Sequence, residues 1–310
     1  MGVQTAKGTE KAKKNRVDGG IKGPRMAQFF YVGPHLILFL IFGIIPLFYG
    51  LYASFTRWDL VGSPQWVGLD NYREILVNTG STFNRQFWNG VKNTVIFVVA
   101  AVPFLVTIPL LLAVALNAKV KASGFFQSIF YVPGLFSISA VALIWSLVFN
   151  PRVGPINNLF GSEVNWFSFQ PNAWIIILAT SVWWGIGGNL VIYRAALSGV
   201  PRDMYEAAEI DGAGAVKKFF YITIPSIKFP LLYTTIMTTV GAFNIYGQPV
   251  MLTNGGPTES TYVAMMYIRD LAFGRGQAVA GMASAMAILL GSVMVIISVF
   301  QFAVMRKYAD

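Results

Sequence analysis

The chain has 310 residues, of which 55% are hydrophobic and only 12% charged, and it contains no cysteine. This composition is too apolar for an ordinary water-soluble globule and predicts an integral membrane protein. The lack of cysteine excludes disulfide frameworks, thiolate metal sites and cysteine nucleophiles. The net charge of +10 does not indicate nucleic-acid binding, because a basic patch for that purpose occupies a soluble face with interleaved aromatic residues.

The N-terminal residues 1–27 are basic and poor in apolar side chains, which predicts a disordered cytoplasmic tail. A long apolar run follows over residues 28–55. It ends without a small-residue cleavage site, so we expect a retained signal anchor rather than a signal peptide that is removed.

Six apolar runs are long enough to cross a bilayer, for which a helix needs about 20 residues. The sequence therefore predicts an all-α polytopic membrane protein whose permease domain covers residues 28–305. If both termini are cytoplasmic, most of the 23 Lys and Arg lie on the inner side, in agreement with the positive-inside rule. Residues 306–310 are then a cytoplasmic C-terminus. The predicted spans are 28–55, 89–117, 125–149, 173–199, 222–246 and 278–305.

A charged stretch over residues 201–221 separates the fourth and fifth spans. Pro201 suits the first position of a helix, and Glu206 lies near its positive N-terminal end. We predict one short helix over 201–210 and a second over 213–221, which together form a helix-turn-helix elbow.

The break between these two helices is assigned to Asp211 and Gly212. Asp211 is a good N-cap for the second helix, and Gly212 tolerates the turn. From spacing alone, an ordinary cytoplasmic loop remains an equal alternative to a functional elbow.

At these residues the sequence resembles the permease subunits of ATP-binding-cassette (ABC) importers. Their cytoplasmic coupling motif reads Glu-Ala-Ala, three residues, Gly, nine residues, Ile, one residue, Leu-Pro. The resemblance implies that the elbow, Asp211 included, docks into a cleft of a separate ATPase subunit. Ile224 replaces the Leu of the motif, and the matching positions are Glu206, Ala207, Ala208, Gly212, Ile222 and Pro225.

Two further runs, residues 66–72 and 252–257, resemble the first of the two permease subunits in carbohydrate importers of the maltose and glycerol-3-phosphate type. The resemblance covers nearly the whole chain from Gln28 onward. The two extra N-terminal spans and the large external insertion of the maltose permease are missing. The resemblance implies four kinds of partner, namely a second homologous permease, two copies of an ABC ATPase, an extracytoplasmic sugar-binding protein and the sugar itself. It also implies a bacterial or archaeal cytoplasmic membrane.

Several kinds of functional residue are absent from the sequence, and their absence limits the functions that we expect. No Asp or Glu lies within the six runs, which disfavours an ion-coupled sugar carrier. No phosphate-binding loop is present, so we expect no ATPase site or other enzyme activity here, with ATP and Mg used by a partner. No metal site is expected either, since the lone His35 has no partner ligands. A non-catalytic membrane scaffold remains the plain alternative.

The fourth run carries several glycines, which would weaken a helix needed only for anchorage by about 1 kcal/mol each. Helix packing is one explanation, and a substrate path is the other. Aligned on the two sequence motifs, the resemblance places sugar-contacting positions at Ser181, Gly185 and Gly188 in this run. In the fifth run it places them at Thr238, Gly241 and Ala242.

Other side chains of these runs suit sugar recognition by their chemistry. Trp183, Trp184 and Tyr193 offer faces for stacking, while Asn189, Asn244 and Gln248 offer hydroxyl partners. The sequence thus predicts a permease subunit for a neutral mono- or oligosaccharide, with a glycerol-3-phosphate or other polyol-phosphate permease as the alternative.

Overall fold

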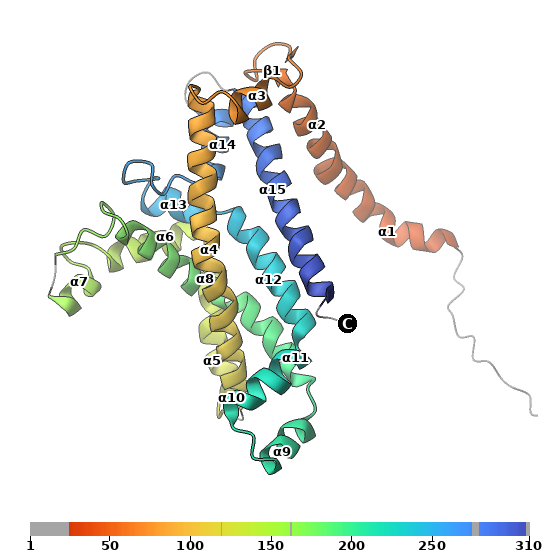
Figure 1. The fold of residues 1–310 in the computed structure, drawn as a ribbon, viewed down its shortest axis with the longest axis vertical. Helices are drawn as coiled ribbons and strands as arrows, with labels where there is room; N and C mark the ends of the chain where they lie inside the picture. Colours follow the sequence, from red (N-terminus) through yellow and green to blue (C-terminus); the bar gives the residue numbers. More distant parts are fainter. Residues whose placement is uncertain (1–24, 119, 162, 275–278, 308–310) are drawn as a thin grey trace, which may run out of the picture. The chain divides into compact units, whose positions relative to one another are not determined.

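The computed structural model describes residues 25–118, 120–161, 163–274 and 279–307 (Figure 1). Nearly all of the predicted basic tail, residues 1–27, lies outside the described residues. The chain divides into two compact units, residues 1–49 and 50–310.

The first unit is helical throughout its described part. It contains α1 (Arg25–Phe39), a π-helical turn η1 (Leu40–Ile44) and the start of α2 (Ile45–Ser54). The segment Phe30–Ser54 is long and apolar enough to cross a membrane.

The π-helical turns of the chain share one sequence context. Both η1 and η3 (Phe219–Thr223) are followed by one isoleucine and then a proline, Pro46 or Pro225. Proline has no N–H and its ring collides with the carbonyl four residues earlier. Widening the preceding turn to an i→i−5 pattern moves that carbonyl aside, so the helix continues past the proline.

The second unit begins with a short loop region. Strand β1 (Thr56–Arg57) pairs antiparallel with β2 (Gln65–Trp66), with Thr56 opposite Trp66, and helix α3 (Asp70–Leu76) follows.

Helix α4 (Thr82–Asn117) begins earlier than the predicted residue 89. Ser81 caps it, because its hydroxyl accepts a hydrogen bond from the Phe83 amide at 3.1 Å. Helix α4 packs along α8 (Asn172–Ser198) and also contacts α12 (Lys228–Phe243). These three helices form the centre of the unit.

The third predicted span, residues 125–149, is not one straight helix. It consists of α5 (Ser123–Tyr131), a 3-10 turn η2 (Val132–Leu135) and α6 (Ile138–Val148), with a bend of 102° before α6. The sequence did not indicate this bend, because an apolar run gives length but no direction, while Pro133 and Gly134 interrupt the helical ladder. Helix α7 (Pro155–Phe160) follows.

The fifth predicted span, residues 222–246, ends at Phe243, three residues earlier than predicted. A nearly continuous helical segment runs through α10 (Ala215–Lys218), η3, α11 (Ile224–Ser226) and α12, and it ends at Phe243. After a break, α13 (Gly247–Leu252) and α14 (Ala264–Phe273) lead to α15 (Ala280–Lys307).

Among the described residues, four helices are long and apolar enough to cross a membrane, or up to five if the bent pair counts as one span. That the chain crosses the membrane six times therefore remains a proposal. The four helices are Phe30–Ser54, Thr82–Asn117, Asn172–Ser198 and Ala280–Val304.

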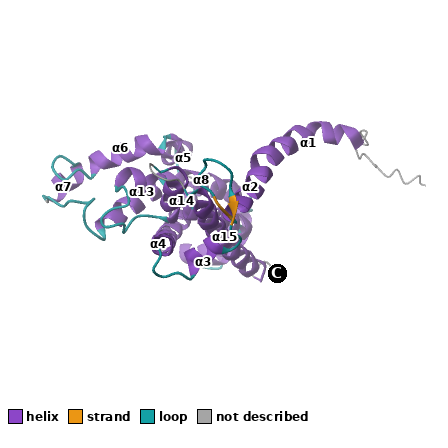
Figure 2. Cartoon of the chain, turned by 90° about the horizontal axis from the view of Figure 1, so that it is seen from above, coloured by secondary structure: helices purple, strands orange, loops and turns teal. Residues whose placement is uncertain are grey.

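Within the second unit, Figure 1 places α3 and β1 at one end of α4 and the short helix α9 (Arg202–Ile210) at the other. Seen from above, α6 and α13 lie next to each other and beside α8 (Figure 2). The largest buried cluster joins α4, α6, α8 and α12–α15, and includes Phe97, Ile177 and Phe243.

Candidate functional site

A cavity of about 410 Å³ opens between α4, α6, α8 and α12, and we call it the inner cavity. Most of the residues that the sequence predicts for a substrate path line this cavity. The residues between α12 and α13 form part of its wall. The predicted residues that line it are Ser181, Trp184, Gly185, Gly188, Asn189, Thr238, Gly241 and Asn244, together with Ala242 and Gln248.

The wall of the inner cavity is built where two helical segments are interrupted. The indole N–H of Trp184 donates to the Phe136 carbonyl at 3.1 Å, at the bend before α6. A β-carbon on Gly247 would lie 2.8 Å from Ile138, so the starts of α13 and α6 touch closely. Irregular backbone inside a membrane domain needs such partners, because lipid offers none.

Asn189 joins three helices at the cavity. Its side-chain amide donates to the Leu105 carbonyl on α4 and to the Thr238 hydroxyl on α12, both at 2.9 Å. The Leu105 carbonyl is the group that an N–H at position 109 would bind, and Pro109 has none. Asn189 therefore satisfies a backbone acceptor that the proline leaves open, and only its side-chain oxygen remains for a ligand.

The glycines of α8 divide into two kinds. A β-carbon on Gly187 would lie 2.7 Å from the Tyr131 Cα, and one on Gly185 would lie 2.7 Å from the Leu105 side chain. Gly188 has no atom within 4 Å of that position, and the same holds for Gly241 on α12. Packing thus explains Gly187, whereas Gly188 and Gly241 leave open space in the cavity wall.

Two amide side chains of the cavity make no hydrogen bond to another helix among the described residues. The Gln248 side chain makes no hydrogen bond among the described residues, and the Asn244 amide donates only to the Val240 carbonyl of its own helix at 2.9 Å. Phe97, Trp184 and Tyr246 add aromatic surface. No Lys, Arg, His, Asp or Glu is among the described residues that line the cavity.

Two aromatic residues predicted to offer stacking faces do not line the cavity. Trp183 packs edge-on against Trp145, with ring centroids 5.7 Å apart. Tyr193 is fully buried and its hydroxyl lies 2.6 Å from that of Thr234. Both residues were predicted from residue type alone. In the structure, their positions on α8 direct the two side chains towards neighbouring helices.

The sequence pointed to α8 and α12 but missed the contributions of α4 and α6. Phe97, Leu105 and Ile138 line the cavity and have no distinguishing residue type. One signal was present, since Pro109 frees the Leu105 carbonyl and Asn189 is an amide within an apolar run that can donate to it.

The elbow between α8 and α12 begins with α9. Pro201 is its N-cap rather than its first helical residue. Asp211 ends α9 and does not cap the next helix, whose N-cap is Gly214, so that expectation was wrong. The reason is local, because the chain must turn at Gly212 before a new helix can start.

Gly212 adopts φ +74°, which favours glycine. The Ala213 amide donates to the Ala208 carbonyl at 2.8 Å and the Gly212 amide to the Glu209 carbonyl at 3.0 Å. This is the Schellman pattern of helix termination. A 2.5 Å ion pair between Lys218 and Glu209 then holds α10 against α9.

The motif residues of the elbow face outward. Glu206, Ala207, Asp211, Gly212 and Pro225 are exposed and Ala208 is half-buried. Glu206 also borders a hollow of about 610 Å³ between the elbow and the ends of α4 and α8. Three large apolar side chains nearby are exposed, namely Ile210 (88%), Tyr221 (81%) and Val216 (71%).

Apolar helices around an uncharged polar cavity, with an exposed helical elbow at one end, define the class of membrane transport subunits. Residues 77–310 match the family of binding-protein-dependent transport system inner membrane components, and the chain belongs to this family. The family resemblance seen in the sequence is thereby confirmed.

Relatives and solved structures agree with this assignment. The chain is 32% identical over 292 residues to the probable ABC transporter permease protein YesP of Bacillus subtilis, covering 91% of this chain and 90% of that protein. It is 29% identical over 320 residues to the arabinooligosaccharides transport system permease protein AraP of Halalkalibacterium halodurans, covering 96% of each. A bacterial ABC transporter involved in the import of the acidic polysaccharide alginate has a similar fold, with a TM-score of 0.79, 24% identity and coverage of 92% of this chain and 96% of that one.

Proposed function

We propose that this chain is one permease subunit of an ATP-driven, binding-protein-dependent importer of a neutral mono- or oligosaccharide. It forms half of the translocation path and works by alternating access. Relatives named for the transport of arabinooligosaccharides and of starch degradation products support the substrate class.

The inner cavity is the observation that carries this proposal. A sugar presents hydroxyls that both donate and accept hydrogen bonds, together with apolar C–H faces. Gln248 and Asn244 offer amide groups, and Trp184 and Tyr246 offer aromatic surface, within one cavity. Because these groups are uncharged, they suit a neutral ligand.

The inner cavity does not support the alternative, a polyol-phosphate permease. A phosphate is normally bound by Arg or Lys. Arg194 is the described cation of α8, but its guanidinium donates to the Gln127 side chain at 2.5 Å and to the Ser123 carbonyl at 3.3 Å. It ties α8 to α5 and does not line the inner cavity.

Six membrane crossings with both termini in the cytoplasm fit this function. Besides the four long helices and the bent pair, the helical segment over residues 219–243 is about 37 Å long at ~1.5 Å per residue, which exceeds the ~30 Å hydrocarbon core. Four crossings precede the elbow, so a cytoplasmic N-terminus places the elbow, which carries the residues predicted for ATPase coupling, in the cytoplasm.

The elbow is the proposed contact with the ATPase. Its exposed apolar side chains and the exposed carboxylate of Glu206 match a surface that a partner covers. In this proposal two copies of an ABC ATPase bind ATP and Mg, this chain binds no cofactor, and a second permease completes the path. A sugar-binding protein delivers the substrate from the outer side.

Transport by the reconstituted complex tests the proposal. The chain, its second permease, the ATPase and the binding protein would be placed in liposomes, and uptake of radiolabelled arabino-oligosaccharides, maltodextrins and glycerol 3-phosphate compared. We expect sugar uptake that requires ATP. Uptake that persists on a cation gradient without ATP would support an ion-coupled carrier. If uptake is unchanged when this chain is omitted, the chain is a non-transporting scaffold.

A further inference from the structure

Arg194 carries the only side-chain charge of helix α8 and stands four residues before the helix ends at Ser198. Because α8 has 27 residues, it is about 40 Å long and exceeds the ~30 Å hydrocarbon core of a bilayer. The end of α8 that leads into the elbow therefore lies at the level of the lipid headgroups, which the long side chain of an arginine reaches.

The guanidinium of Arg194 is held by neutral acceptors at the start of α5. It donates to the Gln127 side-chain oxygen at 2.5 Å, and to the carbonyl and the hydroxyl of Ser123, both at 3.3 Å. Among the described residues, no carboxylate lies within 4.0 Å of it. The N-terminal end of a helix carries partial positive charge, so α5 does not offset the cation. Arg194 is therefore a half-buried, fixed cation with no counter-ion in the described part of the chain.

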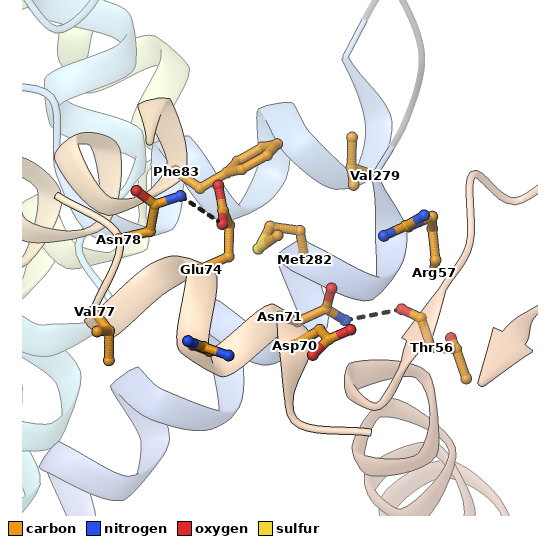
Figure 3. A pocket seen from close by; sticks show the side chains of 11 residues that line it. Thr56, Arg57, Asp70, Asn71, Glu74, Val77, Asn78, Phe83, Val279 and Met282 are labelled. Carbon is orange, nitrogen blue, oxygen red and sulfur yellow. Dashed lines mark hydrogen bonds between the residues drawn. The ribbon is translucent and has the colours of Figure 1, made fainter. Parts of the chain in front are cut away.

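The segments that form this site contain no acidic residue. No Asp or Glu occurs in residues 75–162 or 164–202, which include α4, α5, α6 and α8. Lys121, which is exposed and precedes α5 by two residues, adds a second positive charge. By contrast, the cavity of about 820 Å³ between β1, α3 and the starts of α4 and α15 has two arginines and two carboxylates on its rim (Figure 3). Charges balance in that cavity, whereas those of the site at Arg194 are positive and are complemented by an anion.

Exposed apolar side chains lie on the same two helices as the polar groups of this site. Phe125 and Ile129 of α5 are exposed, and so is Val191, which stands one turn before Arg194 on α8. In a membrane-spanning chain, side chains of this kind contact acyl chains or another subunit. A fixed cation at headgroup level next to exposed apolar helices matches the two parts of a phospholipid, its phosphate and its acyl chains.

We propose that Arg194, the Ser123 hydroxyl and Lys121 bind the phosphate of an anionic phospholipid whose acyl chains lie along α5 and α8. Guanidinium and phosphate form charge-assisted hydrogen bonds, and the Ser123 hydroxyl keeps a proton that it can donate. A headgroup with net negative charge, such as phosphatidylglycerol, is favoured over phosphatidylcholine, because the ammonium group of phosphatidylcholine would be repelled by the two cations. The bound lipid joins α8 to α5 next to the elbow. Binding requires only that the chain lies in a membrane, so it is independent of which solute is transported.

Native mass spectrometry of the purified complex tests this site. The full-length chain is purified with the subunits that accompany it, and phosphatidylglycerol or phosphatidylcholine with the same acyl chains is added. We expect the wild type to prefer phosphatidylglycerol, and Arg194→Gln to reduce this preference by roughly 5-fold or more, the usual contribution of one cation at a membrane surface. Arg152→Gln is the matched control, because it makes the same charge change at an exposed arginine between α6 and α7 and should keep the preference. Unchanged preference in Arg194→Gln, or an equal loss in Arg152→Gln, would overturn the proposal.

Two further variants separate lipid binding from helix packing. Gln127→Leu removes the 2.5 Å hydrogen bond between α5 and α8 but leaves the cation, so thermal stability should fall while the preference for phosphatidylglycerol remains. Arg194→Lys keeps a cation and should retain most of the preference. If Gln127→Leu loses the preference as fully as Arg194→Gln does, Arg194 acts through packing and the lipid site is wrong.

Other occupants of the site give different results. Millimolar inorganic phosphate should not displace phosphatidylglycerol, because the acyl chains also hold the lipid. Complete displacement would indicate a site for free anions and would contradict the proposal. If Arg194→Gln releases another subunit while phosphatidylglycerol binding stays unchanged, the counter-ion is a carboxylate of that subunit, and the lipid assignment fails.

Discussion

The side-chain amide of Asn189 lies 2.9 Å from the carbonyl oxygen of Leu105 and replaces the helical hydrogen bond that Pro109 cannot make. The same amide reaches Thr238, so one side chain ties α8 to both α4 and α12 at the wall of the inner cavity. Asn189, which was predicted to bind the sugar, therefore also holds three helices together.

Asn189→Leu should lower the stability of the complex as well as uptake. Interhelical hydrogen bonds in membranes contribute roughly 1–2 kcal/mol, so we expect a lower apparent melting temperature in detergent. Pro109→Ala in the same background should restore part of the loss, because the new N–H can take the Leu105 carbonyl. If Pro109→Ala restores nothing, the proposed link between the two residues is wrong.

Asn244→Leu and Gln248→Leu should reduce sugar uptake without affecting assembly. The Gln248 side chain makes no hydrogen bond among the described residues, and Asn244 binds only within its own helix. Losing a hydrogen bond to a sugar costs about 0.5–1.5 kcal/mol, or roughly 2- to 10-fold in apparent affinity. Gln301→Leu on α15 is the control, since that residue contacts Thr239 outside the cavity. Normal transport by both cavity variants would contradict the assignment of the path.

Gly188→Leu should block transport in a complex that still assembles, because its side chain would enter open space in the inner cavity. Gly187→Leu should instead prevent stable assembly, since a β-carbon alone would lie 2.7 Å from the Tyr131 backbone. Size-exclusion chromatography and uptake separate the two outcomes. If the two variants behave alike, the assignment of Gly187 to helix packing and of Gly188 to the substrate path is wrong.

Changes in the elbow should uncouple ATP hydrolysis from transport. Gly212→Ala places a β-carbon at φ +74°, at a cost of about 1–2 kcal/mol, and Gly212→Pro cannot adopt that angle. Glu206→Ala should weaken the seat of the ATPase, whereas Asp203→Ala, also an exposed carboxylate of α9, serves as the control. ATPase retention on purification and sugar taken up per ATP would be measured. Unchanged values in the Gly212 and Glu206 variants would make the elbow an ordinary loop.

A reporter active only in the cytoplasm checks the proposed topology. It should work when fused after Met305 or inserted within residues 119–123, and it should fail near Gly80 or Gly161. These sites alternate across the six proposed spans. A cytoplasmic signal at Gly80 or Gly161 would refute the arrangement.

The sequence alone determined the class of protein and indicated the two regions for which a function is proposed. Apolar runs reveal membrane helices because burial in lipid depends on composition. The elbow motif was readable because its residues lie within one short segment. The residues expected in a substrate path came from resemblance combined with residue type, and all of them except Trp183 and Tyr193 line one cavity.

Only the tertiary structure decided which side chains share a surface. The bend of 102° before α6 and the break after Phe243 depend on contacts with other helices, such as Trp184 with Phe136 and Gly247 with Ile138. Trp183 and Trp184 are adjacent in sequence, yet one packs on Trp145 and the other lines the cavity. Apolar patterning shows which helices are suited to a membrane, but packing against neighbouring helices decides how much of each helix is buried and where each side chain points.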